Sequence, residues 1–326
     1  MMRTSCKYGF LILALFLTGA TTNAQSTFPA ETRNAALRYW MAFAEMQDPP
    51  TDKATADLLE KTAAGEMAWD EWKLGPILDA NGEAVRAMQR ATKLPECDWG
   101  LEYSLGPRAP ISYVARARVL ARLNTLYGMR LAAKGDSQGA ADTWLAGIGF
   151  SQHLAKGGSL IFSLIAKTVL LSNFQALTQA ARNGVLHEAQ RAQVQSIANA
   201  LPETGFDWAE ALHFEESPLE IGVQQLAAAS NPAEYYKALM GRAAPPNFTI
   251  PSAKDIDAFH KLMNSAEELL RLPPQKAEDK LKLLQESVKS LHPYFQETTP
   301  SFLKINDARM QVLSARQELL QALAGR

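Results

Sequence analysis

The sequence predicts an all-α protein, built from stacked antiparallel helical hairpins in a superhelix or an irregular helical bundle, with a C-terminal helical subdomain. Apolar residues recur at spacings of three and four along almost the whole chain, which is the period of amphipathic helices. The apolar/polar alternation typical of strands is nearly absent. Prolines and glycines fall between the periodic runs, where helices end.

The composition is that of a folded protein with a large core. Of 326 residues, 47% are hydrophobic and 21% are charged, which excludes collagen-like and disordered chains and small disulfide scaffolds. The length allows one large domain or two smaller ones.

The first 24 residues predict a signal peptide. Arg3 and Lys7 form a positive start, residues 10–17 are an apolar run too short to span a bilayer, and a small-residue tail follows. We therefore expect an exported mature chain that begins at Gln25 and is periplasmic or secreted. The alternative is a retained N-terminal anchor.

Charge and cysteine content narrow the function classes. Loss of Arg3 and Lys7 reduces the 33 basic residues to 31, against 34 acidic residues, for a net charge of −3. This balance gives no support for a nucleic-acid partner. Cys97 is the sole cysteine left, so no intrachain disulfide is expected. The longest later apolar run, 160–171, is interrupted by polar residues, and we expect no membrane span after signal cleavage.

Helices are expected between the proline and glycine breaks, in this order: 31–47, 52–64, 82–94, 111–134, 137–156, 159–183, 187–201, 205–229, 232–241, 252–271, 274–291 and 299–324. Asn183-Gly184 is typical of a helix C-terminus, and Ser159, Ser252 and Thr299 of N-caps.

Two segments do not fit helices. Residues 95–110 hold two glycines and three prolines beside Trp99 and Tyr103, which predicts an ordered loop that packs its aromatic side chains on neighbouring helices. Residues 243–251 are also proline-rich, and the chain beyond them is richer in Lys and Glu. We expect a domain boundary there, between a main helical domain at 25–243 and a C-terminal subdomain at 252–326.

One predicted helix pair carries a spacing of small and large residues that allows close helix packing. The residues concerned are Gly128, Gly135, Asp136, Ala140, Trp144 and Gly147. In this order they resemble a tetratricopeptide-type repeat over about residues 124–156, which implies a tight antiparallel hairpin. Asn124 departs from the early Trp of that family and Gly147 from its usual Ala, and no second copy follows at the repeat spacing.

The Cys97-Asp98-Trp99 loop, the Gly135-Asp136 hairpin and the acidic stretch at Glu215-Glu216 together resemble an uncharacterised group of exported bacterial all-helical proteins. That resemblance implies no activity.

The richest polar cluster lies in the predicted helix 205–229. Glu210 and His213 are three residues apart, on one helix face, and Glu216 follows after three more. A Glu-x-x-His pair is half of a di-iron ligand set in helical bundles, but the chain has no second such pair. We expect Pro218 to bend or break this helix. The cluster is either a solvated acidic face or a metal or proton-transfer site.

Other charged side chains are candidate binding residues. Lys167 lies in an apolar helix and needs either solvent or a carboxylate, for which we expect Glu215 or Glu216. A basic side of the helix 111–134, suited to an anionic ligand or an acidic partner, is formed by Arg116, Arg118 and Arg122.

We therefore predict an exported helical binding or scaffold protein whose partner is an envelope protein or a peptide. No catalytic residue, metal ligand or cofactor is assigned, because no known catalytic motif occurs. The alternative is a metal-binding or acid/base enzyme of the cell envelope that uses Glu210, His213 and Glu216.

Overall fold

The computed structural model describes residues 31–111 and 113–325, and the predicted signal peptide lies outside these ranges. In the described ranges the chain forms thirteen α-helices and two short 3-10 helices, with no strand beyond one isolated bridge. The all-α prediction is thus confirmed. The α-helices are α1 (Ala35–Glu45), α2 (Lys53–Ala63), α3 (Glu71–Ala91), α4 (Tyr113–Ala133), α5 (Ser137–Ala155), α6 (Leu160–Arg182), α7 (Glu188–Ala200), α8 (Trp208–Ala228), α9 (Pro232–Met240), α10 (Ala253–Leu270), α11 (Pro274–Ser287), α12 (Pro293–Thr298) and α13 (Phe302–Ala324).

The α4–α5 hairpin packs as closely as its small residues predict. A Cβ on Gly128 would lie 2.4 Å from Nε1 of Trp144, so only glycine fits beside the indole ring. Gly135 makes the turn at φ +81°, and Asp136 caps α5 by accepting the Gly139 N–H at 2.8 Å. This close contact explains why small residues occur at these positions of α4 and α5.

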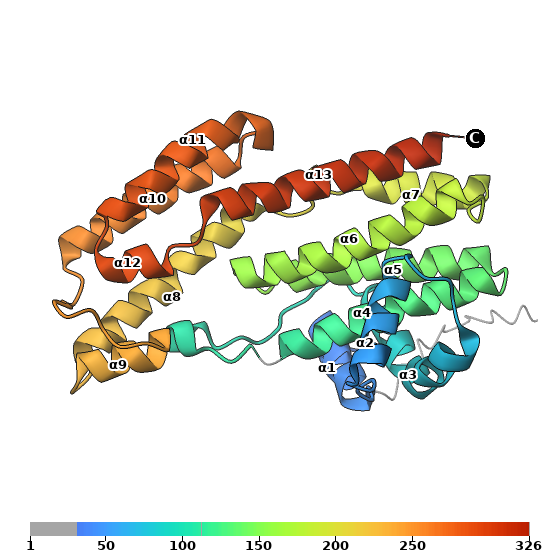
Figure 1. The fold of residues 1–326 in the computed structure, drawn as a ribbon, viewed down its shortest axis with the longest axis horizontal. Helices are drawn as coiled ribbons and strands as arrows, with labels where there is room; N and C mark the ends of the chain where they lie inside the picture. Colours follow the sequence, from blue (N-terminus) through green and yellow to red (C-terminus); the bar gives the residue numbers. More distant parts are fainter. Residues whose placement is uncertain (1–30, 112, 326) are drawn as a thin grey trace, which may run out of the picture. The chain divides into compact units, whose positions relative to one another are not determined.

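Helix α6 is an apolar helix of the core. It packs against α4, α5, α8 and α13, and Figure 1 shows it running between α5 and α13. Within the described chain, it is the one helix long and apolar enough to cross a membrane by length and composition, and 61% of its apolar window is buried inside the structure. A core helix of a soluble protein meets the same criteria.

The loop before α4 supplies part of the core, as expected. Trp99 is 4% exposed, stacks on Tyr113 with ring centroids 4.4 Å apart, and donates from Nε1 to the carbonyl of His153 at 2.9 Å. The nearby Cys97 thiol is free, and burial raises its pKa to about 12, which favours the protonated thiol at neutral pH.

The C-terminal helices pack against the preceding part of the chain. Helix α10 lies on α8, and α13 lies along α6 (Figure 1). Residues 33–326 group as one unit by their contacts. The division into domains at 243–251 stays a prediction.

Several sequence expectations fail at helix ends. Helix α3 begins at Glu71 rather than at 82 and continues through Pro76, its sixth residue, although proline has no N–H to bond to the carbonyl four residues earlier. The last helix is capped by Ser301, not by Thr299. Helix α8 runs through Pro218 without a break.

Candidate functional site

A cluster of histidines and glutamates lies between α8 and α10. Helix α8 contributes His213, Glu216 and Glu220, spaced so that they share one face. Helix α10 contributes His260 and Glu267, seven residues and about two turns apart. His213 contacts Glu267, whereas His260 contacts Glu216 and Glu220, so the two faces interlock along the helix pair.

Both helices are fixed at their N-termini by side-chain caps. Asp207 accepts the Glu210 N–H at 2.9 Å at the start of α8. Ser252 and Asp255 form a reciprocal capping box at the start of α10. These caps hold the backbone that carries the cluster.

Three donor atoms converge at one end of the cluster. Nδ1 of His213 lies 3.1 Å from Oε1 of Glu267 and 3.7 Å from Oε1 of Glu216. One ligand atom from each of the three residues lies within 4.8 Å of the others. A guanidinium nitrogen of Arg271 approaches the second Glu267 oxygen at 3.9 Å. The His213 side chain is 63% exposed, so the site opens to solvent on that side.

The two carboxylates are buried. Glu216 is 7% exposed and Glu267 is 8% exposed. Burial raises the pKa of the Glu216 carboxyl, and the nearby Glu267 carboxyl adds to the rise, whereas His260 opposes it. Oε1 of Glu216 is buried and has no hydrogen-bond partner. The cluster therefore holds an unsatisfied carboxylate oxygen at its centre.

His260 orients Glu216. Nδ1 of His260 bonds the Oε2 atom of Glu216, and Nε2 of His260 lies 2.5 Å from Oε1 of Glu220. Partial burial lowers the pKa of His260, but its bonds to Glu220 and Glu216 outweigh that effect and raise the pKa above the usual value. The ring is thus a bridge between two carboxylates.

The structure brings together only two of the three residues predicted to act on α8. His213 and Glu216 share the cluster, whereas Glu210 is exposed and lines a separate hollow of about 370 Å³ beside Phe214 and Lys156. Glu210 lies six residues before Glu216, about one third of a turn away around α8, and so it lines a different surface.

The prediction of a carboxylate partner for Lys167 is wrong. Its ammonium donates to Oε1 of Gln311 on α13 at 2.9 Å. Glu215 instead accepts the Leu160 N–H at 2.7 Å and so caps α6, where the side chain of Ser159 makes no cap. Burial raises the pKa of Glu215. Glu215 is therefore a helix cap.

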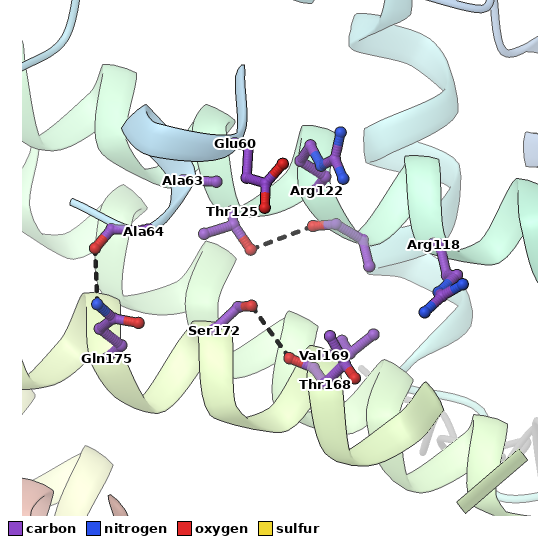
Figure 2. A pocket seen from close by; sticks show the side chains of 11 residues that line it. Glu60, Ala63, Ala64, Arg118, Arg122, Thr125, Thr168, Val169, Ser172 and Gln175 are labelled. Atoms are coloured by element: carbon purple, nitrogen blue, oxygen red, sulfur yellow. Dashed lines mark hydrogen bonds between the residues drawn. The ribbon is translucent and has the colours of Figure 1, made fainter. Parts of the chain in front are cut away.

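The three arginines predicted to form one basic face have different surroundings. Arg116 forms an ion pair with Asp48 at 2.6 Å. Arg118 and Arg122 line a cleft of about 520 Å³ between α2, α4 and α6, together with Glu60 (Figure 2). The acidic cluster on α8 is not the partner of any of these arginines.

Three residues of the cluster were not predicted as site residues from the sequence, namely Glu220, His260 and Glu267. The signal was present in part, because the spacing of His260 and Glu267 places both on one face of the predicted helix 252–271. The sequence contains nothing that pairs that face with α8.

The comparisons offer no guide to this site: no protein-family model, curated protein or solved structure matches the chain.

Proposed function

We propose that the protein binds a divalent transition-metal ion, with Zn²⁺ as the first candidate, through His213, Glu216 and Glu267. The observation that carries the proposal is the buried Oε1 atom of Glu216, which has no hydrogen-bond partner and lies 3.7 Å from Nδ1 of His213. A buried carboxylate oxygen without a partner costs free energy, and a bound cation removes that cost.

The donor separations suit such an ion. Zn²⁺ binds imidazole nitrogen and carboxylate oxygen at about 2.0–2.2 Å, so donors of a tetrahedral site lie about 3.4 Å apart. The distances from His213 to Glu267 and to Glu216 are 3.1 Å and 3.7 Å. The donor atoms of Glu216 and Glu267 lie within 4.8 Å of each other, so these side chains would move closer together around one ion.

The surroundings support the same proposal. Metal-binding carboxylates are commonly held by hydrogen bonds from residues behind them. His260 holds Glu216 in this way and is itself held by Glu220. Three protein ligands leave a fourth position, which faces solvent beside the exposed His213. A metal ion held by these residues would lower the pKa of a bound water, so the predicted alternative of an acid/base enzyme of the cell envelope stays part of this proposal.

The test is a zinc titration of residues 25–326 by calorimetry, with metal content measured by elemental analysis. We expect about one equivalent of Zn²⁺, and we expect His213→Gln and Glu267→Gln each to weaken binding by more than about 100-fold, since each removes a ligand. Glu210→Gln is the matched control on α8 and leaves the affinity unchanged. Equal affinities of the wild type and the two ligand variants would refute the site.

A second candidate function is that of an exported helical binding protein for an envelope protein or a peptide. The favouring observation is the arginine-lined cleft between α2, α4 and α6. A tetratricopeptide-like superhelix remains part of this candidate, and so does export to the periplasm or medium. N-terminal sequencing of the protein from the host's envelope and culture medium tests export, for which we expect a start at Gln25; an intact Met1 in both fractions rules out cleavage.

A further inference from the structure

Helix α4 presents two arginines that make no hydrogen bond or ion pair with the residues that the structure describes. Every other arginine in the described part of the chain makes a hydrogen bond, an ion pair or a ring contact. Arg118 and Arg122 make none, and they lie four residues apart, on one face of α4. Two adjacent unpaired guanidinium groups are suited to an anionic ligand.

Both arginines line the same cleft, and so does an unpaired acidic group. The cleft has a volume of about 520 Å³, which lies in the range of small-molecule sites. Glu60 of α2 lines it as well, and its carboxylate makes no hydrogen bond or ion pair within the described residues. In Figure 2, Glu60, Arg122 and Arg118 lie across the cleft from Thr168 and Ser172 of α6.

The hydroxyls that line the cleft can act as acceptors, and Gln175 lines it as well, with its amide nitrogen donating to the Ala64 carbonyl at 2.6 Å. The hydroxyls of Thr125, Thr168 and Ser172 each donate to a carbonyl of their own helix, at 3.1, 3.1 and 3.0 Å. The oxygen lone pairs of Thr168 and Ser172 therefore remain available to a donor, whereas Thr125 is only 1% exposed. Glu60 and these oxygens suit an ammonium group, while the arginines suit carboxylates.

We propose that this cleft binds an acidic zwitterion, namely a dicarboxylic amino acid or a short acidic peptide. Its carboxylates pair with Arg118 and Arg122, and its ammonium group pairs with Glu60. The cleft's two positive charges and one negative charge leave a net charge of +1, which such a ligand with net charge −1 balances. Ala63, Ala121 and Val169 supply apolar contact for its carbon chain. The proposal is independent of the metal site.

The test is calorimetric binding of L-glutamate and of the tripeptide Ala-Ala-Glu to residues 25–326. Glutarate, which has both carboxylates but no ammonium group, is the comparison ligand. We expect glutamate or the tripeptide to bind up to about fivefold more tightly than glutarate, because Glu60 is exposed and an exposed ion pair is worth up to about 1 kcal/mol. Which of the two binds more tightly distinguishes a free amino acid from a peptide end.

Single substitutions test which residues of the cleft bind the ligand. We expect Arg118→Gln and Arg122→Gln each to weaken binding at least about tenfold, and Glu60→Gln to remove the preference for glutamate over glutarate. Arg116→Gln is the matched control, since Arg116 lies on the same helix but pairs with Asp48. Failure of both ligands to bind at about 10 mM, unchanged binding in both arginine variants, or equal binding of glutamate and glutarate overturns the proposal.

Discussion

Nδ1 of His213 on α8 lies 3.1 Å from Oε1 of Glu267 on α10, although 54 residues separate them in the chain. The contact joins a mostly exposed imidazole to a carboxylate that is 8% exposed. It exists because α8 and α10 pack together, so the candidate metal site is assembled by the tertiary fold.

The residues behind the ligands should tune metal affinity without binding the ion. We expect His260→Gln and Glu220→Gln to weaken Zn²⁺ binding about 10- to 100-fold, because each loosens the orientation of Glu216. Calorimetric titration measures this change, and the stoichiometry should stay near one. Unaltered affinity in both variants contradicts a supporting role for the His260 bridge.

Neighbouring glutamates on α8 should have separable roles. Glu215→Ala removes the cap from the Leu160 N–H of α6, and we expect it to lower the free energy of unfolding by about 1 kcal/mol. Its zinc affinity should match the wild type. Glu216→Gln should lose zinc affinity instead. Urea denaturation and zinc titration of both variants check the separation; a loss of zinc affinity in Glu215→Ala speaks against it.

Close packing of the α4–α5 hairpin should make Gly128 intolerant of a methyl group. In Gly128→Ala the new Cβ meets the Trp144 indole at 2.4 Å, and we expect a loss of about 1–3 kcal/mol in the free energy of unfolding. Gly82→Ala in α3 is the control, because its Cβ meets only the flexible end of Arg86, at 3.3 Å. Helix propensity predicts a gain of about 0.5–1 kcal/mol there. Urea denaturation compares the two, and equal effects would contradict the packing argument.

His153 should make the fold less stable in mild acid. Burial, together with the smaller effect of the Lys156 charge, lowers its pKa to about 4, and the ring bonds the Tyr39 hydroxyl at 2.7 Å. Because the unfolded pKa is about 6.5, the unfolded chain binds more protons between these values, and stability falls as pH drops. We expect a loss of about 2 kcal/mol between about pH 7 and pH 5.

The loss is measured as the difference between the wild type and His153→Gln in urea denaturation at both pH values. Other titrating groups, His260 among them, contribute equally to both proteins and cancel in this difference. A difference that does not change with pH contradicts the assignment.

Most of the helical fold could be predicted from the sequence, because helix periodicity and proline breaks are local. The Asn183-Gly184 terminus is one such case, with Gly184 at φ +70°. The start of α3 was missed because Gly75 and Pro76 are typical of a break, and α12 was missed because it spans only six residues. Pro218 was expected to disturb α8, but the helix continues through it.

The candidate site was predictable only on α8. His213 and Glu216 stand out as a polar pair in one helix, and the cluster contains both. Glu267 and His260 could not be assigned to it, because residues far apart in sequence meet only through packing of α8 on α10. The partner of Lys167 also depends on tertiary packing. The sequence predicts a carboxylate partner, whereas the side chain contacts Gln311 of α13.

The central claim is that one metal ion binds between α8 and α10. The most direct measurement is an anomalous-difference map, recorded at the zinc absorption edge, from crystals of the zinc-loaded protein. We expect one peak at about 2.0–2.2 Å from Nδ1 of His213 and from carboxylate oxygens of Glu216 and Glu267. A map at saturating zinc with no peak among these three side chains contradicts the claim.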